Sequence, residues 1–191
     1  MPRRSAGFTL IETMVACALM VLATGLLGSF FTFFTRQSLR YHTRQELAIQ
    51  AERVLFRIQS TLSGASSGSV VAVDSIAGVR FPTAQVQGQG SLIFDKEGAL
   101  MWQTWQVYGF DKKLGKVWEA RQALATPTKD LQSLSKGPTT AVDSWPRRTL
   151  ALQVTHFQIS GPVNKAFRLQ VALTDKYGYR LELASSVVAH N

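Results

Sequence analysis

The sequence predicts an α+β protein, in which the second half of one long N-terminal helix packs against an antiparallel β-sheet head. Two observations carry this prediction. An apolar run near the start of the chain continues into an amphipathic helical pattern, and the remaining residues alternate between short β-type runs and turns. The chain has 191 residues, of which 46% are apolar, and this is enough for one ordinary domain and an anchor.

The first half of the predicted helix, residues 8–34, is an apolar run whose only charged side chain is Glu12. As a helix it would be roughly 40 Å long, more than the ~30 Å hydrocarbon core of a bilayer. Helices buried in soluble proteins are rarely apolar on all sides, so we expect a transmembrane segment here. Arg3 and Arg4 precede the run and form the basic flank that is typical of the cytoplasmic side.

The second half of the helix, residues 35–62, has the pattern of a helix with one apolar face. No proline interrupts residues 5–81. Apolar residues recur at spacings of three and four, namely Leu47, Ala51, Val54, Leu55, Ile58 and Leu62. We therefore expect this half to lie on the soluble head and to end at Ser63 and Gly64.

Three arginines share one helix face just beyond the apolar run, because Arg36, Arg40 and Arg44 are spaced four residues apart. We favour a solvated face that contacts lipid headgroups. Docking onto acidic partner subunits and binding of DNA are the alternatives.

The predicted head, residues 63–191, consists mostly of strands broken by turns. The candidate strands of its first part are residues 69–73, 79–81, 91–94, 99–110 and 116–120. Residues 126–148 are rich in Pro, Ser, Thr and Lys, and they predict a long surface loop.

The last part of the chain has the clearest alternation of apolar and polar residues. Residues 167–174 predict a strand, Asp175–Gly178 a turn, and residues 179–188 the returning strand. Before them, Leu150, Leu152 and Val154 face one way, while Phe157 and Ile159 require the other face, so we expect a bulge near residues 155–156.

Three interpretations of the N-terminus compete. A cleavable secretory signal would need its A-x-A site at Ala16–Ala18, in the middle of the apolar run, and cleavage there would leave a strongly hydrophobic new end. A lipoprotein signal would end at Cys17, the only cysteine, and would place a charge inside a very short hydrophobic region. The third interpretation rests on residues 3–12.

Residues 3–12 read RRSAG and then FTLIE, which resembles the class III signal of type IV prepilins and type II secretion pseudopilins. The resemblance implies that residues 1–7 are a leader peptide. It further implies that a prepilin peptidase cuts between Gly7 and Phe8 and methylates the new N-terminus at Phe8. Gly7 has no side chain, so its backbone can extend into a protease cleft. The cut precedes the apolar run, so the mature chain would keep its anchor.

Glu12 has two interpretations. Thr9 and Glu12 fit a capping box, in which Thr9 caps the helix and Glu12 returns to its amide, and the helix dipole would favour a carboxylate there. An ionisable group at the edge of a bilayer usually has a partner, however. In the prepilin family that partner is the N-terminal amine of a neighbouring subunit during filament assembly. We favour the assembly role, and the two roles can coexist.

The resemblance also implies a function, partners and a location. We expect a minor pilin or pseudopilin that primes or caps a filament of a type IV pilus or type II secretion system. The alternative is a tip adhesin or a DNA-uptake pilin that binds an external ligand. The partners would be other pilins or pseudopilins, the peptidase and the inner-membrane assembly platform. The protein would cross the inner membrane once, with its N-terminus cytoplasmic and its head periplasmic, before joining the filament. The segments 92–110 and 167–191 loosely resemble heads of J- or W-type minor subunits.

The head shows no recognisable catalytic or cofactor motif, so we expect no enzyme activity, no cofactor and no metal. Asp95 and Glu97 could suggest calcium, but two carboxylates fall far short of six to eight oxygen ligands, and a hairpin turn is favoured. Tryptophans interleaved with basic residues can bind single-stranded nucleic acid, yet a sheet core with a solvated rim is favoured. Without Arg3 and Arg4 of the leader the chain keeps 19 basic and 12 acidic side chains, or +7, which is short of a nucleic-acid footprint.

Overall fold

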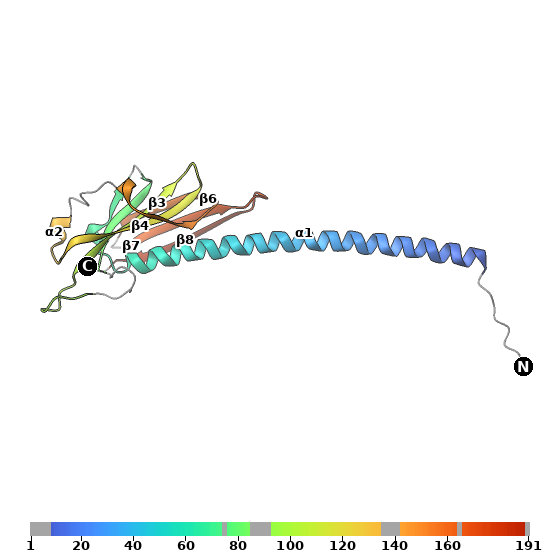
Figure 1. Cartoon of the computed structure of the whole chain (residues 1–191), viewed down its shortest axis with the longest axis horizontal. Helices are drawn as coiled ribbons and strands as arrows, with labels where there is room; N and C mark the ends of the chain where they lie inside the picture. The colour runs from blue at the N-terminus through green and yellow to red at the C-terminus, as the bar shows by residue number, and fades with distance from the viewer. Residues whose placement is uncertain (1–8, 74–75, 85–92, 135–141, 164–165, 190–191) are drawn as a thin grey trace, which may run out of the picture. The chain divides into compact units, whose positions relative to one another are not determined.

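The computed structural model describes residues 9–73, 76–84, 93–134, 142–163 and 166–189. Helix α1 (Leu10–Leu62) is followed by antiparallel β-sheets, so the predicted α+β class is confirmed (Figure 1). The chain divides into two compact units, residues 1–43 and 44–191, and α1 runs across the boundary between them.

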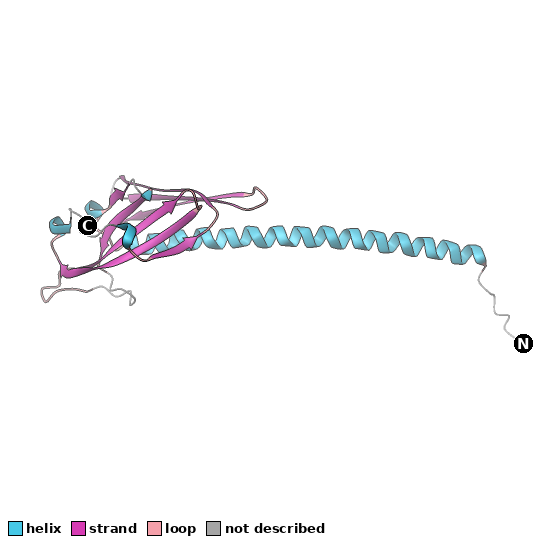
Figure 2. Cartoon of the chain, turned by 45° about the horizontal axis from the view of Figure 1, so that its top comes forward, coloured by secondary structure: helices cyan, strands magenta, loops and turns pink. Residues whose placement is uncertain are grey.

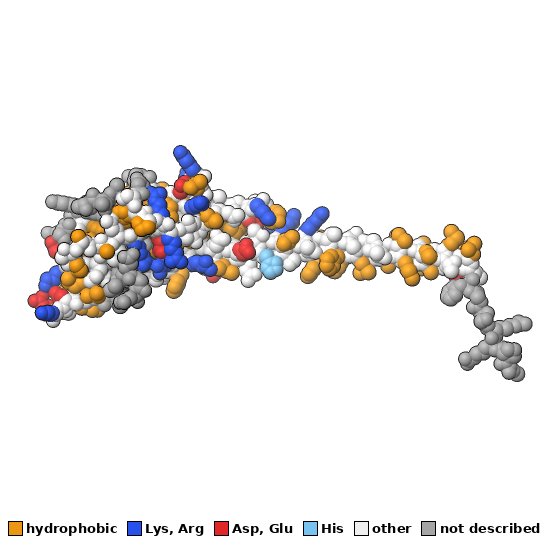
Figure 3. Space-filling model, in the orientation of Figure 1, with side chains coloured by type: hydrophobic (Ala, Val, Ile, Leu, Met, Phe, Trp, Pro, Cys, Tyr) orange, Lys and Arg blue, Asp and Glu red, His pale blue; other side chains and the backbone are white. Residues whose placement is uncertain are grey.

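In the first unit, the apolar part of α1 is exposed on every side. All residues from 9 to 36 are exposed, and Figure 3 shows apolar side chains with almost no charge among them. Among the described residues, α1 is the one helix that is long and apolar enough to cross a membrane, and none of its apolar window is buried. A core helix of a soluble protein would bury these side chains, so this exposure favours a membrane anchor.

In the second unit, α1 buries one face against the head. The buried residues of this stretch are Leu47, Ala51, Val54, Leu55, Ile58, Thr61 and Leu62. They include all six residues of the predicted apolar stripe, which is therefore confirmed. The helix ends at Leu62, as expected, and Ser63 N donates to Gln59 O at 2.9 Å.

The strands form two antiparallel sheets (Figure 2). The first sheet has the order β1-β2-β3-β4-β5, with β1 (Val71–Val73), β2 (Gly78–Thr83), β3 (Trp102–Asp111), β4 (Lys116–Thr128) and β5 (Arg147–Ala151). The second has the order β6-β7-β8, with β6 (Val154–Val163), β7 (Ala166–Thr174) and β8 (Arg180–Val188). The sequence predicted one sheet, and the division into two was not expected.

The chain changes sheets between Ala151 and Val154. Gln153 adopts φ 60°. The backbone on either side of it is bonded to other elements, because Val154 N donates to Gly115 O and Thr174 N donates to Gln153 O, each at 3.0 Å. The predicted common face of residues 150–154 is wrong at Leu152, which is 46% exposed. The predicted bulge is confirmed, because the β6–β7 register shifts between Val154 and His156.

The predicted loop over residues 126–148 is wrong at both ends, because β5 already begins at Arg147. Strand β4 continues to Thr128, and its last part pairs with the start of β3 through Trp102. Two short helices follow, α2 (Leu131–Leu134) and a 3-10 turn (Val142–Ser144), while residues 135–141 lie outside the described part. The predicted strand at 91–94 is described only at residues 93–94, where Phe94 forms an isolated bridge to Leu100.

The head has two apolar cores, one on each face of the first sheet. The larger lies between α1 and both sheets and includes Ile58, Phe81, Tyr108 and Leu169 (Figure 1). The smaller lies on the opposite face of the first sheet and contains three tryptophans: Trp105, Trp118 and Trp145. Their burial confirms that tryptophans form part of the core of the head.

Candidate functional site

The N-terminus of α1 carries the predicted capping box. Thr9 N donates to Glu12 Oε2 at 2.8 Å, and Thr9 Oγ1 donates to the same oxygen at 3.0 Å. In return, Glu12 N lies 3.4 Å from Thr9 Oγ1 and donates to Thr9 O at 3.1 Å. Thr9 therefore stands at the N-cap and Glu12 three residues later, which is the reciprocal arrangement that satisfies the first amides of a helix. The capping interpretation of Glu12 is confirmed.

Capping does not account for where Glu12 lies. Its carboxylate is exposed, and it stands at the start of an apolar helix that is exposed on all sides. In a bilayer such a group needs a cationic or hydrogen-bonding partner. Both bonds that the Glu12 carboxylate accepts from Thr9 reach one oxygen, Oε2, so the carboxylate keeps acceptor capacity for a further donor.

The predicted cleavage site, Gly7 and Phe8, lies outside the described residues. Its chemistry nevertheless connects with the capping box. Thr9 N, which donates to Glu12, is the amide that joins Thr9 to Phe8. A cut between Gly7 and Phe8 would create a positively charged amine one residue from this bond.

A second feature of α1 lies in the head unit, on the face opposite the core. Ile49 is 46% exposed and Phe56 is 73% exposed. Each lies nine residues, or two and a half helical turns, from a buried residue: Ile49 from Ile58, and Phe56 from Leu47. The two exposed side chains are seven residues apart and so share one side of the helix. We call Ile49 and Phe56 the outer ridge.

The outer ridge was not singled out from the sequence, although the signal was present. The same helical spacing that predicts the buried stripe places both residues on the other side. A lone exposed aliphatic residue needs no explanation, but a phenylalanine that is 73% exposed, two helical turns from a second exposed apolar residue, makes this side of the helix a candidate contact surface.

Polar contacts fasten α1 to the first sheet. Arg57 Nε donates to Glu119 Oε2 at 3.2 Å, and Arg121 and Arg148 each approach the same carboxylate to 3.9 Å. Burial alone would lower the pKa of Arg57, but the hydrogen bond to Glu119 and the charge of Glu119 raise it. One turn later, Thr61 Oγ1 lies 2.6 Å from Tyr108 Oη. Burial raises the pKa of Tyr108 to about 12.

The remaining predicted features have simple structural roles. Asp95 accepts bonds from the amides of Glu97 and Ala99, at 2.9 and 2.8 Å, which confirms the turn. Lys129 Nζ lies 3.1 Å from Asp95 and 2.8 Å from Glu97, so a lysine bridges the two carboxylates that could have suggested calcium. The amide of Ala99, and then the Lys129 ammonium, lower the pKa of Asp95. Within the described residues, no cluster of three or more His, Cys, Asp or Glu could hold a metal ion.

The three arginines on one helix face divide between the two units. Arg36 and Arg40 are exposed in the first unit. Arg44, in the second, places its guanidinium carbon 4.4 Å from the ring centre of Tyr179, the residue before β8. Arg44 is thus engaged by the head itself, in a cation–π contact.

Comparison with known proteins places the N-terminus in one family of signals. Residues 2–28 match the family model of the prokaryotic N-terminal methylation motif. No curated protein and no solved structure matches the chain significantly. The match supports a place in the type IV pilin-like superfamily and a structural filament subunit of pilin or pseudopilin type. Together with the exposed apolar helix, it fits a single-pass protein anchored in the inner membrane.

Proposed function

We propose that the chain is a minor pilin or pseudopilin, cut between Gly7 and Phe8, methylated at Phe8, and assembled through α1 into a short filament. The observation that carries this proposal is the match of residues 2–28 to the methylation motif, on a helix whose apolar part is wholly exposed. The head would lie on the periplasmic side and would act by presenting surfaces to other subunits rather than by catalysis. The filament would belong to a type II secretion system or a type IV pilus, with this subunit in its priming or tip complex.

The proposed assembly uses two contacts on α1. Glu12 would receive the N-terminal amine of a neighbouring subunit, because a carboxylate at the edge of an apolar environment gains most from a cationic partner. The outer ridge would pack on a helix of a neighbour, and this contact would bury the exposed ring of Phe56. Prepilin peptidase and the inner-membrane assembly platform are the further partners.

Mass spectrometry tests the processing step. The protein would be co-expressed with its peptidase, purified from membranes and analysed intact. We expect a chain that begins at methylated Phe8. An N-terminus at Met1, or a lipidated chain that begins at Cys17, would contradict the proposal.

Variants of Glu12 separate the capping role from the assembly role. Glutamine can still accept the bonds from Thr9 but carries no charge, so E12Q should be processed and should keep its helix while assembly is lost. E12A should lose both the bonds from Thr9 to the carboxylate and filament assembly. The matched control is Thr9→Ala, which removes the capping hydroxyl and keeps the carboxylate, and which should assemble. Full assembly of E12Q would show that the charge is dispensable.

A head that binds an external ligand, as a tip adhesin or a DNA-uptake pilin, is the second candidate. Binding of single-stranded DNA by stacking would need exposed aromatic rings. The four tryptophans are only 5–6% exposed, and Arg147 covers Trp118 with its guanidinium carbon 4.3 Å from the ring centre. The head therefore offers no tryptophan platform for bases, which favours the structural role. Absence of a salt-sensitive mobility shift with DNA would agree with this, and a clear shift at low salt would favour the second candidate.

A further inference from the structure

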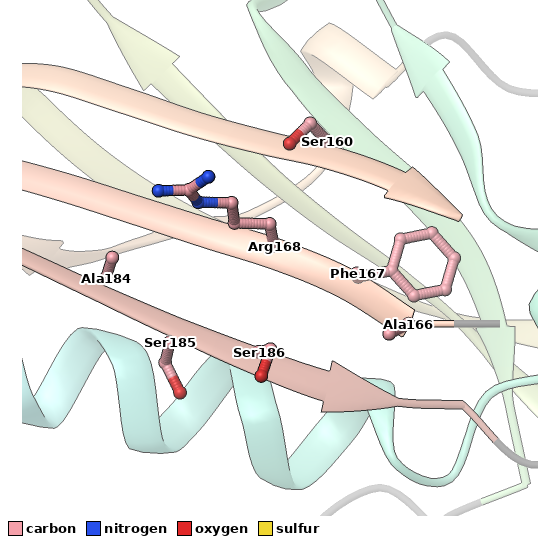
Figure 4. Close-up of a pocket in the computed structure, with 7 residues that line it drawn as sticks. All are labelled: Ser160, Ala166, Phe167, Arg168, Ala184, Ser185 and Ser186. Atoms are coloured by element: carbon pink, nitrogen blue, oxygen red, sulfur yellow. The ribbon is translucent and has the colours of Figure 1, made fainter. Parts of the chain in front are cut away.

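The second sheet carries a hollow that the proposed assembly does not use. Its volume is about 590 Å³, within the range of roughly 300–1,000 Å³ that is typical of small-molecule sites. All three strands contribute to its lining: Ser160 from β6, Ala166, Phe167 and Arg168 from β7, and Ala184, Ser185 and Ser186 from β8 (Figure 4).

The polar groups of the hollow form one row across the sheet. Ser160 pairs with Arg168, and Arg168 pairs with Ser186, in the register of the two ladders. Directly opposed residues have Cβ atoms about 4.5–5.5 Å apart and point to the same face. All three are exposed, whereas the neighbour Phe167 points into the core and is 2% exposed. Figure 4 shows Arg168 on the strand between those of Ser160 and Ser186, with its guanidinium extending along β7 toward the side of Ala184.

Small side chains leave room beside this row. Ala166 precedes Arg168 by two residues on β7, and Ala184 precedes Ser186 by two residues on β8, so both lie on the same face as the row. Each ends at its Cβ atom, and larger residues at these positions would fill the space. The result is a hollow with a guanidinium, two hydroxyls and an apolar floor.

No opposite charge balances the charge of Arg168 within the described part of the chain. No hydrogen bond or ion pair joins its side chain to a described residue. The acidic residue of β8, Glu182, lies four residues before Ser186, or roughly 13 Å along the strand. It is already paired with Arg180, whose Nη2 lies 3.2 Å from Glu182 Oε2. The five N–H donors of Arg168 therefore have no carboxylate acceptor among the described residues.

We infer that the hollow binds a small anion that bears one carboxylate or one phosphate group. Arg168 is the counter-ion, since a guanidinium matches both groups with two parallel hydrogen bonds. Ser160 and Ser186 donate further hydrogen bonds from the two flanking strands, and the uncharged part of the ligand lies against Ala184, which pairs with Gln170 on one side of the row. This inference concerns the head alone, so it stands or falls independently of the proposed filament role.

The test is an NMR titration of the full chain in detergent micelles. Arginine labelled with ¹⁵N reports each side chain through its Nε–H resonance. The probes are inorganic phosphate, N-acetylglycine and, as a neutral match, N-acetylglycinamide, all at constant ionic strength. We expect a saturable shift of the Arg168 resonance with phosphate, with N-acetylglycine, or with both, and none with the amide. The tighter of the two anions identifies the class of ligand.

Variants show whether the row makes the site. Ser160→Ala combined with Ser186→Ala should weaken binding about tenfold, which corresponds to about 1.4 kcal/mol. Arg168→Lys should weaken it because the two parallel bonds are lost, and since this variant lacks the Arg168 resonance its affinity is read from the backbone amide of Ser186 in uniformly ¹⁵N-labelled protein. Arg180→Gln is the matched control, because Arg180 lies on the same sheet but is paired with Glu182, and it should leave the affinity unchanged. The inference is overturned if neither anion gives a saturable shift, if Arg168 and Arg180 shift alike, or if the double serine variant and Arg168→Lys bind as the wild type does.

Discussion

Replacing Tyr108 with phenylalanine tests the contact that joins α1 to the first sheet, and the structure predicts opposite effects at neutral and alkaline pH. The Tyr108 side chain is fully buried, with its Oη 2.6 Å from Thr61 Oγ1. Thr61 Oγ1 keeps the carbonyls of Arg57 and Ile58 as acceptors, at 3.1 and 3.0 Å, so it is not orphaned by the change. Near neutral pH, Y108F should therefore lower the free energy of unfolding by only about 1 kcal/mol, the value of one buried hydrogen bond.

At alkaline pH, Y108F should become more stable than the wild type, because burial raises the pKa of Tyr108 to about 12, from its ordinary value of 10. Between these values the unfolded chain loses the tyrosine proton while the folded chain keeps it. The unfolded state then binds fewer protons, so the free energy of unfolding falls as pH rises, by at most about 1.4 kcal/mol per pH unit. This stabilising contribution is complete below pH 10 and lost by about pH 12, a loss of about 2–3 kcal/mol. Y108F lacks it.

The assay is urea unfolding in detergent, followed by tryptophan fluorescence. All four tryptophans lie in the head and are 5–6% exposed, so their emission reports unfolding of this unit. The wild type should be the more stable protein at pH 8, and its curve should cross that of Y108F between pH 10 and 12. Tyr179→Phe, at an exposed tyrosine, is the control that should run parallel to the wild type. Parallel curves for Y108F would refute the reasoning.

Two further changes test other parts of the fold. Phe56→Ser on the outer ridge should leave the free energy of unfolding within about 0.5 kcal/mol of the wild-type value but reduce filament assembly. Gln59→Ser, at an exposed polar position, should assemble normally. Equal assembly of the two variants in a pull-down of tagged subunits would remove the ridge from the interface. Gly78→Ala should destabilise the head by about 1–3 kcal/mol, because a Cβ at Gly78 would overlap the carbonyl of Tyr108, whereas Gly68→Ala meets no atom within 4 Å and should unfold at the wild-type midpoint.

The features that the sequence predicted well depend on the local pattern of apolar and polar residues, or on which side chains face the solvent. The helix over residues 10–62 follows from an apolar run and a stripe of period 3.6, and both persist whatever the head does. The β7–β8 hairpin likewise follows from alternation around a turn. Its turn is closed by Asp175, which accepts the amides of Tyr177 and Tyr179 at 2.8 Å each, with Gly178 at φ 82°.

The features that were missed depend on contacts between residues far apart in the chain. The change of sheet at Gln153 is fixed by bonds to Gly115 and Thr174, which no local pattern reveals. The extension of β4 to Thr128 depends on its pairing with Trp102. The hollow around Arg168 needs three strands in register, so single residues such as Ser160 gave no signal.

The two halves of α1 are therefore constrained by different partners, and this separation has a consequence for function. The apolar half is exposed on every side, and the first buried residue of α1 is Leu47. Changes at the head surface, such as at Arg168, can alter what the subunit recognises without touching the capping box of Glu12 or the motif at residues 2–28. Conversely, under the proposed function a change at Glu12 is expected to abolish assembly while the head keeps its fold. A loss of assembly with an unchanged urea midpoint thus indicates a defect in α1, whereas a lowered midpoint indicates a defect in the packing of the head.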